Sequence, residues 1–295
     1  MRSLRRLRTI ISHIAGRVSE LLPPAVERCG TSPAVGAPRV LLAALRSMRS
    51  GSREALVPLN DSATVAVDLA TPHGRGIFAY GFCQPAACIM QSLLAPGEVM
   101  IDGGANIGLF TVLAAARVGP DGRVIACEPS PTTAALLRAN IERNGFDWVE
   151  AREVALAETP GRLRMHVFDP GSGFSSFAPA TSGSQVEVDV TTLDELAGDV
   201  LEQVKLVKLD IEGAEARALR GAPRLLDGPR PDFIVELEPE HLQRQGGSAA
   251  EVQELFQAAD YVGYSISHTM TLEPLGAVWQ RPTGDPNILV RPRER

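Results

Sequence analysis

The segment VMIDGGANIGLFTVLAAARVGPDGRVIACEPS, residues 99–130, constrains the fold of this chain more than any other stretch. It opens with an apolar run that is typical of a buried strand. The glycine-rich turn 102–108 ends that strand, and the alanine-rich segment 109–118, which has no breaker, predicts a helix packed on a sheet. A second short strand, 123–127, stops at Glu128 and the proline that follows. The pattern predicts a βαβ unit.

Such a unit suits a nucleoside ligand. A glycine turn lets a ligand approach the backbone closely, because no side chain intervenes. The N-terminus of the following helix offers amide groups to a polar or anionic group. Glu128 lies about 20 residues after Gly108, where an acidic side chain accepts hydrogen bonds from ribose hydroxyls.

The turn itself separates the candidate cofactors. Dinucleotide-binding turns read G-x-G-x-x-G, whereas this turn begins with Asp102 and carries Asn106 in place of a second glycine. A carboxylate at the strand end suits the α-ammonium group of S-adenosylmethionine and repels a pyrophosphate. The residues therefore favour S-adenosylmethionine. An NAD(P)-dependent Rossmann oxidoreductase and a non-catalytic S-adenosylmethionine-binding module remain as alternatives.

Four motifs in this order carry a family resemblance: IDGGANIGLFT, GRVIACEPSP, LRANIERN and LVKLDIEGAEARALRGA. Together they resemble the FkbM-type family of class I S-adenosylmethionine-dependent methyltransferases, most strongly over residues 99–221. The resemblance implies an α/β fold with a Rossmann-like, doubly wound, mostly parallel seven-stranded sheet and a late antiparallel strand. It also implies methylation of a hydroxyl oxygen on a small molecule, natural product or glycan.

The cofactor prediction combines the turn, the tip of the second strand, the third strand and the end of the fourth. The segment 148–156 reads as the third strand, and in class I methyltransferases the turn after this strand lines the adenine. The predicted cofactor-binding residues are Asp102, Gly104, Ala105, Asn106, Gly108, Glu128, Pro129, Val154, Ala155 and Asp210.

Carboxylates follow two further predicted strands. The fourth strand, 206–209, ends at Asp210, and Glu212 and Glu215 come directly after it. In an open parallel sheet ligands bind at the carboxyl ends of the strands, so we expect Asp210 on the same rim as the glycine turn. Carboxylates before a helix are also favoured by its dipole, so helix capping is the alternative role for Glu212 and Glu215.

Methyl transfer is an in-line displacement at the sulfonium carbon, and the enzyme must position the acceptor and remove its proton. The sequence predicts Asp210, Glu212 and Glu236, the last near the end of a fifth strand, as the catalytic residues. Lys208 shares a strand face with Asp210 and is expected to contact it. A divalent metal is possible but not favoured, because no Asp-Asn pair follows the fifth strand, and no metal ligand is assigned.

The chain before residue 96 reads as two parts. Residues 1–55 form a basic arm and linker, because residues 1–53 hold ten arginines and two glutamates. This arm is either a solvated helix or a docking helix for an anionic surface or a partner. Residues 56–95 read as a small β-rich cap, with a turn at 71–74 and a strand from Gly76. Residues 96–295 form the methyltransferase domain.

Composition narrows the partners and the compartment. A net charge of −6 does not suggest nucleic acid. Four cysteines without a C-x-x-C pair give no zinc signature, and reduced thiols in a cytoplasmic protein are expected. No apolar run is long enough to span a membrane. The acceptor and the oligomeric state are left open by the sequence.

Local signals complete the prediction. Ser130 and Thr192 are expected N-caps, and Gly145 an expected left-handed C-cap. The glycine-rich loop 169–176 is expected to act as a lid over the acceptor. Further expected elements are strands at 162–167 and 185–190, one helix after Glu215 that reaches about Leu226, a helix from Ser248 to Ala259, and an antiparallel pair at 261–267 and 287–291.

Overall fold

The structure is a computed structural model that describes residues 53–80, 84–167, 175–176, 184–282 and 285–293. The chain divides into two compact units, one ending at Cys83 and the other beginning at Gln84. The predicted arm therefore lies outside the described residues apart from its last three positions. The start of the methyltransferase domain at residue 96 stays a prediction, and the second compact unit begins twelve residues earlier, at Gln84.

The first unit is an antiparallel hairpin, β1 (Glu54–Asn60) and β2 (Ala63–Asp68), followed by helix α3 (Pro72–Tyr80). The prediction of a strand from Gly76 was wrong. The Thr71 hydroxyl accepts a hydrogen bond from the Gly74 amide at 2.9 Å and so caps a helix in place of a turn. The β-rich cap is therefore part helical.

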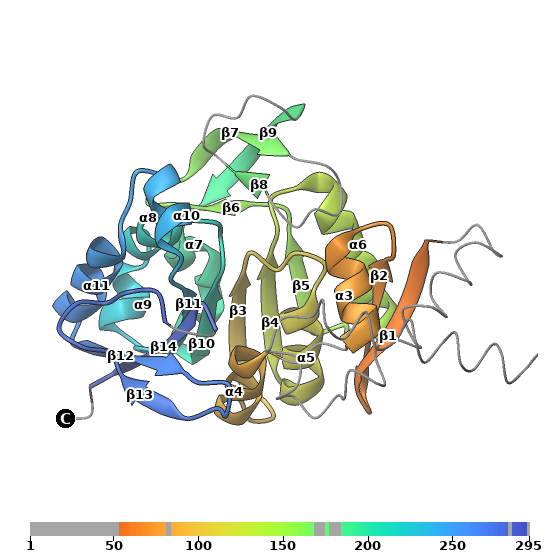
Figure 1. Ribbon diagram of the computed structural model, residues 1–295, viewed down its shortest axis with the longest axis horizontal. Coiled ribbons are helices and arrows are strands. Elements are labelled where there is room, and N and C mark those ends of the chain that lie inside the picture. The colour runs from red at the N-terminus through yellow and green to blue at the C-terminus, as the bar shows by residue number, and fades with distance from the viewer. Residues whose placement is uncertain (1–52, 81–83, 168–174, 177–183, 283–284, 294–295) are drawn as a thin grey trace, which may run out of the picture. The chain divides into compact units, whose positions relative to one another are not determined.

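The second unit contains an eight-stranded sheet in the order β13-β12-β14-β11-β10-β3-β4-β5 (Figure 1). Its strands are β3 (Val99–Gly103), β4 (Arg123–Cys127), β5 (Val149–Arg152), β10 (Val204–Leu209), β11 (Asp232–Glu236), β12 (Tyr261–Ile266), β13 (Leu272–Pro274) and β14 (Asn287–Pro292). The five strands from β5 to β11 are parallel, and β14 is antiparallel to β11 and to β12. The mostly parallel α/β sheet with a late antiparallel strand is confirmed, and β13 adds an eighth strand at the edge.

The helices of this unit are α4 (Pro85–Leu93), α5 (Leu109–Val118), α6 (Pro131–Asn144), α7 (Leu193–Ala197), the 3-10 helix η2 (Gly198–Gln203), α8 (Glu215–Arg220), α9 (Pro223–Asp227), α10 (Pro239–Arg244) and α11 (Ala249–Ala258). The single helix predicted after Glu215 and as far as Leu226 is in fact two helices, α8 and α9. Pro223 separates them because it has no amide proton to continue the preceding helix.

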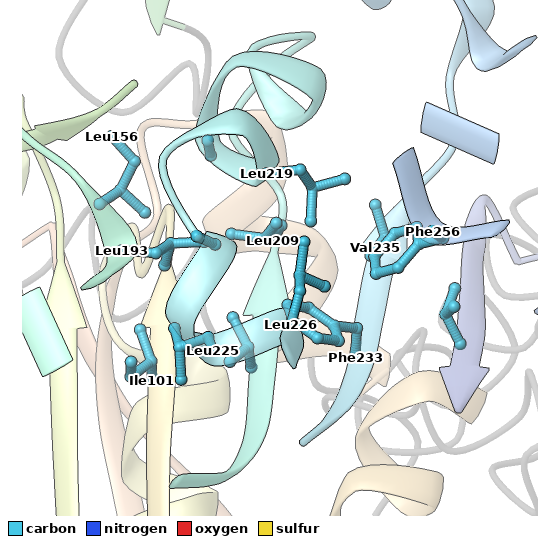
Figure 2. Packing of buried hydrophobic residues seen from close by; sticks show 14 of the residues in the cluster. Ile101, Leu156, Leu193, Leu209, Leu219, Leu225, Leu226, Phe233, Val235 and Phe256 are labelled. Atoms are coloured by element: carbon cyan, nitrogen blue, oxygen red, sulfur yellow. The ribbon is translucent and has the colours of Figure 1, made fainter. Parts of the chain in front are cut away.

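Apolar side chains from strands and helices form one core beside the central strands (Figure 2). Ile101 and Phe233 come from β3 and β11, and Leu225 and Phe256 come from helices α9 and α11; all four are fully buried. The Phe233 and Phe256 rings meet edge to face, 5.0 Å between centroids. This packing fixes the strands whose ends carry the polar residues of interest.

A second sheet has the order β6-β9-β7-β8, with β6 (Ala155–Leu156), β7 (Gly161–Val167), β8 (Ser175–Ser176) and β9 (Ser184–Thr191). The sequence predicted one strand over 148–156, but the structure divides it between the two sheets. β5 pairs with β4 only as far as Cys127, where β4 ends, and the chain beyond it pairs with β9 instead. Most of the predicted lid loop lies outside the described residues.

Two of the three predicted caps behave as expected. Thr192 accepts a hydrogen bond from the Glu195 amide at 3.1 Å, and Gly145 takes a left-handed conformation with φ 66°. Ser248, where a helix was expected to begin, caps α11 by accepting from the Glu251 amide at 3.2 Å. Ser130 holds the N-cap position of α6 but makes no side-chain cap. In the described part of the chain, no helix has the length and apolarity needed to cross a bilayer.

Candidate functional site at the strand ends

The register of the parallel strands brings four chain segments to one edge of the sheet. Gly103 of β3 pairs with Cys127 of β4 on one side and with Leu209 of β10 on the other. β10 in turn pairs with β11, and Leu209 lies opposite Val235. Strands β3 and β10 are neighbours although β4 and β5 lie between them in sequence, so the strand order reverses here. Ligands of open α/β sheets bind at such a switch point.

Gly104 begins the turn at this edge, and only glycine fits there. Its φ is +77°, and a Cβ on it would lie 1.8 Å from the carbonyl oxygen of Asp210. The amides of Gly104 and Ala105 both donate to the Cys127 carbonyl, at 3.0 and 2.8 Å. The backbone of the turn is therefore held between the end of β4, through these hydrogen bonds, and the end of β10, through the close contact with Asp210.

The rest of the turn leads into helix α5. Asn106 has φ 52°, and its side-chain oxygen accepts from the Ile107 amide at 2.7 Å, a local bond that suits asparagine in this conformation. Gly108 is the N-cap of α5 with φ 96°. The predicted turn residues thus form one continuous loop from Gly104 to Gly108, which we call the backbone cradle.

Glu128 lies beside that cradle and is 7% exposed. Its carboxylate accepts hydrogen bonds from the Asn106 amide at 3.0 Å and the Ser130 amide at 2.9 Å. Burial raises the pKa of Glu128 to about 7, against the opposing effect of these two amides. Pro129, the next predicted residue, is half-buried.

Asp102 was expected at the open rim, and the structure buries it completely. Its Oδ2 accepts from the Thr111 hydroxyl at 2.6 Å, and its Oδ1 lies 3.9 Å from Nζ of Lys208. Burial raises the pKa of Asp102, and Lys208 opposes the rise. Asp102 still lies within β3, and its side chain is buried in the protein, where it contacts Thr111 and Lys208. The expected contact with a ligand ammonium stays a prediction.

Two other predicted cofactor residues also pack inward. Val154 is half-buried against the main core, and Ala155 is 3% exposed in the apolar cluster of the second sheet. The described contacts do not bring either side chain together with the turn residues.

Asp210 follows β10 across the switch point from Gly104, and its amide donates to the Gly103 carbonyl at 3.1 Å. Its Oδ2 contacts Nζ of Lys208 at 3.1 Å, as the shared strand face predicted. Lys208 is 2% exposed and lies over the Phe110 ring at 4.6 Å. Burial alone would lower the pKa of Lys208, but Asp210 and Asp102 outweigh it and the pKa is raised.

Glu212 and Glu236 meet at one histidine that the sequence reasoning missed. Nδ1 of His241 lies 3.1 Å from Oε2 of Glu212 and 3.3 Å from Oε2 of Glu236. Burial, with Asp210 adding to it, raises the pKa of Glu212 to about 8 and that of Glu236 to about 9. A signal was present in the sequence, since His241 stands five residues after Glu236 at the same strand end.

Glu215 has a structural contact that differs from the helix capping considered for it, because α8 has no side-chain cap. Its Oε1 accepts from the amides of Ile211 and Gly213 at 3.0 and 3.3 Å, so it stabilises the loop before α8. Burial raises the pKa of Glu215 to about 7. Glu212 does not share this role, because its contact is with His241.

Glu212, Glu236 and His241 also offer donor atoms within 4.8 Å of one another, a group that could hold a metal ion. An imidazole nitrogen with two carboxylates is a donor set that Mn²⁺, Fe²⁺ and Zn²⁺ accept. The sequence assigned no metal ligand.

Comparison with known proteins gives one family. Residues 102–262, more than half of the chain, match the family described as "Methyltransferase FkbM domain". The match begins at Asp102 and includes every residue of the strand-end site.

Curated relatives agree with this match. Methyltransferase 1 of Beauveria bassiana is 29% identical over 171 residues, 51% of this chain and 67% of the relative. The 31-O-demethyl-FK506 methyltransferase FkbM of Streptomyces tacrolimicus is 29% identical over 173 residues, 48% of this chain and 65% of the relative. Methyltransferase sdnD of Sordaria araneosa is 30% identical over 166 residues, 45% of this chain and 64% of the relative. The chain thus spans about two thirds of these relatives, and slightly less for the last two.

Among solved structures, the methyltransferase FkbM of Methylobacillus flagellatus KT is similar with a TM-score of 0.45 and 17% identity. The similarity covers 86% of this chain and 58% of that one.

Proposed function

This chain belongs to the FkbM methyltransferase family, and from that membership we propose that it moves the methyl group of S-adenosylmethionine to a hydroxyl oxygen. The family confirms the predicted methyltransferase class. The proposal goes further in naming the oxygen and in dividing the strand-end site into a cofactor side and an acceptor side.

The observation that carries the proposal is the backbone cradle at the switch point. Gly104 has no side chain, so the turn packs directly against the Asp210 carbonyl and its backbone is held at the switch point, where ligands of open α/β sheets bind. We assign Glu128 to the ribose hydroxyls, because its two amide bonds leave further acceptor positions on the carboxylate. Asp102 acts indirectly in this proposal, by holding Thr111 and Lys208.

The acceptor side is the group of carboxylates after β10 and β11. Asp210, Glu212 and Glu236 surround the place where an acceptor hydroxyl has to lose a proton as it attacks the methyl carbon. The raised pKa values of Glu212 and Glu236, about 8 and about 9, make these groups strong bases in their ionised form, although each holds its proton more tightly near neutral pH than an ordinary glutamate does. The relative named for 31-O-demethyl-FK506 supports oxygen as the methylated atom. A small molecule, natural product or glycan remains the proposed acceptor class.

Two alternatives are separated by binding and turnover. A dinucleotide-dependent oxidoreductase is disfavoured by the family. A module that binds S-adenosylmethionine without catalysis has the same cradle but gives no methylated product.

The test has two stages. Isothermal titration compares S-adenosylhomocysteine with NAD⁺ on the full chain, and we expect binding of the first only. Tritiated S-adenosylmethionine is then offered with 31-O-demethyl-FK506, other hydroxylated natural products and oligosaccharides, and label is sought on oxygen. Preference for NAD⁺, or label on nitrogen or carbon alone, would contradict the proposal.

Substitutions assign the bases. We expect Asp210→Asn and Glu236→Gln to reduce turnover by a factor on the order of 10², with S-adenosylhomocysteine binding kept. Glu254→Gln, on the exposed face of α11, is the matched control. Near wild-type turnover in both site variants would remove these carboxylates from the acceptor side.

A further inference from the structure

We propose that Nε2 of His241 is the atom that takes the proton from the acceptor hydroxyl, with Glu212 and Glu236 holding the ring through Nδ1. The inference rests on the proposed O-methyl transfer and adds a residue that neither the family match nor the sequence motifs assign. It also changes the part of the two glutamates, which become positioning residues for the histidine.

The geometry is that of an oriented base. Both carboxylate contacts, at 3.1 and 3.3 Å, are made by Nδ1. Nε2 lies on the other side of the ring. The His241 side chain is 16% exposed, so the ring is largely enclosed yet reachable. A base whose second nitrogen is fixed by a carboxylate recurs in enzymes that remove a hydroxyl proton.

The chain is shaped locally to make this contact. A Cβ on Gly213 would lie 2.1 Å from the His241 carbonyl oxygen, so only glycine lets the loop after β10 approach α10 this closely. The neighbouring Glu212 has φ 57°, a conformation uncommon for this residue type, and its carboxylate thereby reaches the ring. Glu236 reaches the same nitrogen from the end of β11.

Charges around the ring decide its protonation. The groups that face it are Asp210 and Glu212 after β10, Glu236 and Glu238 after β11, and Glu240 and Arg244 on α10. Burial, helped by Arg244, lowers the pKa of His241 below 6.5 against the acidic groups. The imidazole is therefore neutral at pH 7. The like charge of Glu212 raises the pKa of Glu236, so one proton on the pair relieves that repulsion and leaves the other carboxylate ionised. The ionised carboxylate accepts from Nδ1–H, and the lone pair then belongs to Nε2.

The step balances without another reactant. The acceptor O–H bond breaks and its proton goes to Nε2, giving an imidazolium. The oxygen lone pair forms the O–CH₃ bond, and the electron pair of the breaking C–S bond stays on sulfur, giving neutral S-adenosylhomocysteine. The imidazolium then releases its proton to water.

The experiment reads the tautomer directly. Long-range ¹H–¹⁵N NMR of the full chain with S-adenosylhomocysteine bound, assigned by His241→Gln, reports which ring nitrogen carries hydrogen. We expect Nδ1–H, a single titration below pH 6.5, and redistribution of the tautomers in a Glu212→Gln/Glu236→Gln double variant. The result Nε2–H, or no change in the double variant, would overturn the proposal.

Two further measurements complete the test. For any alcohol methylated in the panel, we expect His241→Gln to lower turnover about 10²-fold or more while S-adenosylhomocysteine affinity stays within about twofold. His268→Gln is the matched control, a histidine after β12 outside the site. Stoichiometric Mn²⁺ binding that broadens the His241 signals would instead make the trio a metal site and overturn the proposal. Failure of S-adenosylhomocysteine to bind wild-type protein would count against the proposed function itself.

Discussion

The two sides of the switch point handle buried carboxylates in different ways. On the β3–β4 side the carboxylate of Glu128 is held by two backbone amides. On the β10–β11 side Asp210, Glu212 and Glu236 crowd together around Lys208 and His241. In the proposed function, the first arrangement offers one acceptor group to the ribose. The second arrangement keeps protons on carboxylates near neutral pH, which is useful where a proton has to move.

An acidic residue at a strand end is the same sequence signal on both sides. The protonation of its carboxyl depends on the groups that surround it in the fold. Burial raises the pKa on both sides. Like charge from Asp210 adds to the rise on both sides, but at Glu128 it is a smaller cause than the two amides that lower the pKa, whereas at Glu212 and Glu236 it is the largest cause after burial.

The largest expected effect tests whether the two sides depend on one backbone contact. Gly104→Ala should destabilise the protein by about 3–5 kcal/mol, because its Cβ would overlap the Asp210 carbonyl. Gly119→Ala is the matched control, since Gly119 also has positive φ but open space around it. That variant should cost about 1–2 kcal/mol. Denaturant unfolding measures both, and equal losses would show that the close approach of β3 and β10 is unimportant.

The next prediction concerns the amide-held side. Glu128→Gln should weaken S-adenosylhomocysteine binding about 10- to 100-fold, as expected for lost hydrogen bonds to a charged group. Since burial places the pKa of Glu128 at about 7, wild-type affinity should also fall as the pH drops below 7. Titration calorimetry at several pH values measures this. Glu150→Gln, on the neighbouring strand β5, is the control, and an equal loss there would break the assignment of Glu128.

The crowded side should reveal itself in stability against pH. The folded-state pKa of Glu236 is raised from 4.5 to about 9, so the folded protein binds more protons than the unfolded chain between these values. The contribution of the protonated Glu236 carboxyl to the free energy of unfolding is fully present below pH 4.5 and is lost as the pH rises through about 9. Glu236→Gln should therefore stabilise the protein at pH 8 by about 1–2 kcal/mol and flatten the profile. A profile that keeps its wild-type slope would contradict the crowding.

The smallest expected effect tests whether the backbone amides beside Glu128, and not the neighbouring hydroxyl, are what matters there. Ser130→Ala should cost about 0.5 kcal/mol or less, because the Glu128 carboxylate already accepts from the amide of residue 130 and the serine makes no cap. Ser248→Ala removes a cap that is present and should cost about 1 kcal/mol. Thermal unfolding of the two variants side by side measures the difference. The reverse order would mean that the Ser130 hydroxyl matters more than the carboxylate beside it.

Much of the fold was predictable because the positions of strands and helices depend on residues that are close together in the sequence. Apolar runs that end in glycine or a carboxylate located β3, β4, β10 and β11, and turn chemistry located α5. The pairing of strands depends on residues that are far apart in the sequence, and the error over residues 148–156 concerns such pairing. The division of 148–156 between two sheets depends on where β4 stops, which the residues of β5 and β6 do not encode.

The sequence by itself determined that acidic and glycine residues would meet at one edge of a parallel sheet, because side-chain order along a strand and the direction of parallel strands fix that edge. Tertiary structure alone decided which of those side chains open outward. It buried Asp102 against Thr111 and Lys208, and it brought His241 to Glu212 and Glu236. Burial and proximity between distant segments arise from packing, and packing is a property of the folded chain as a whole.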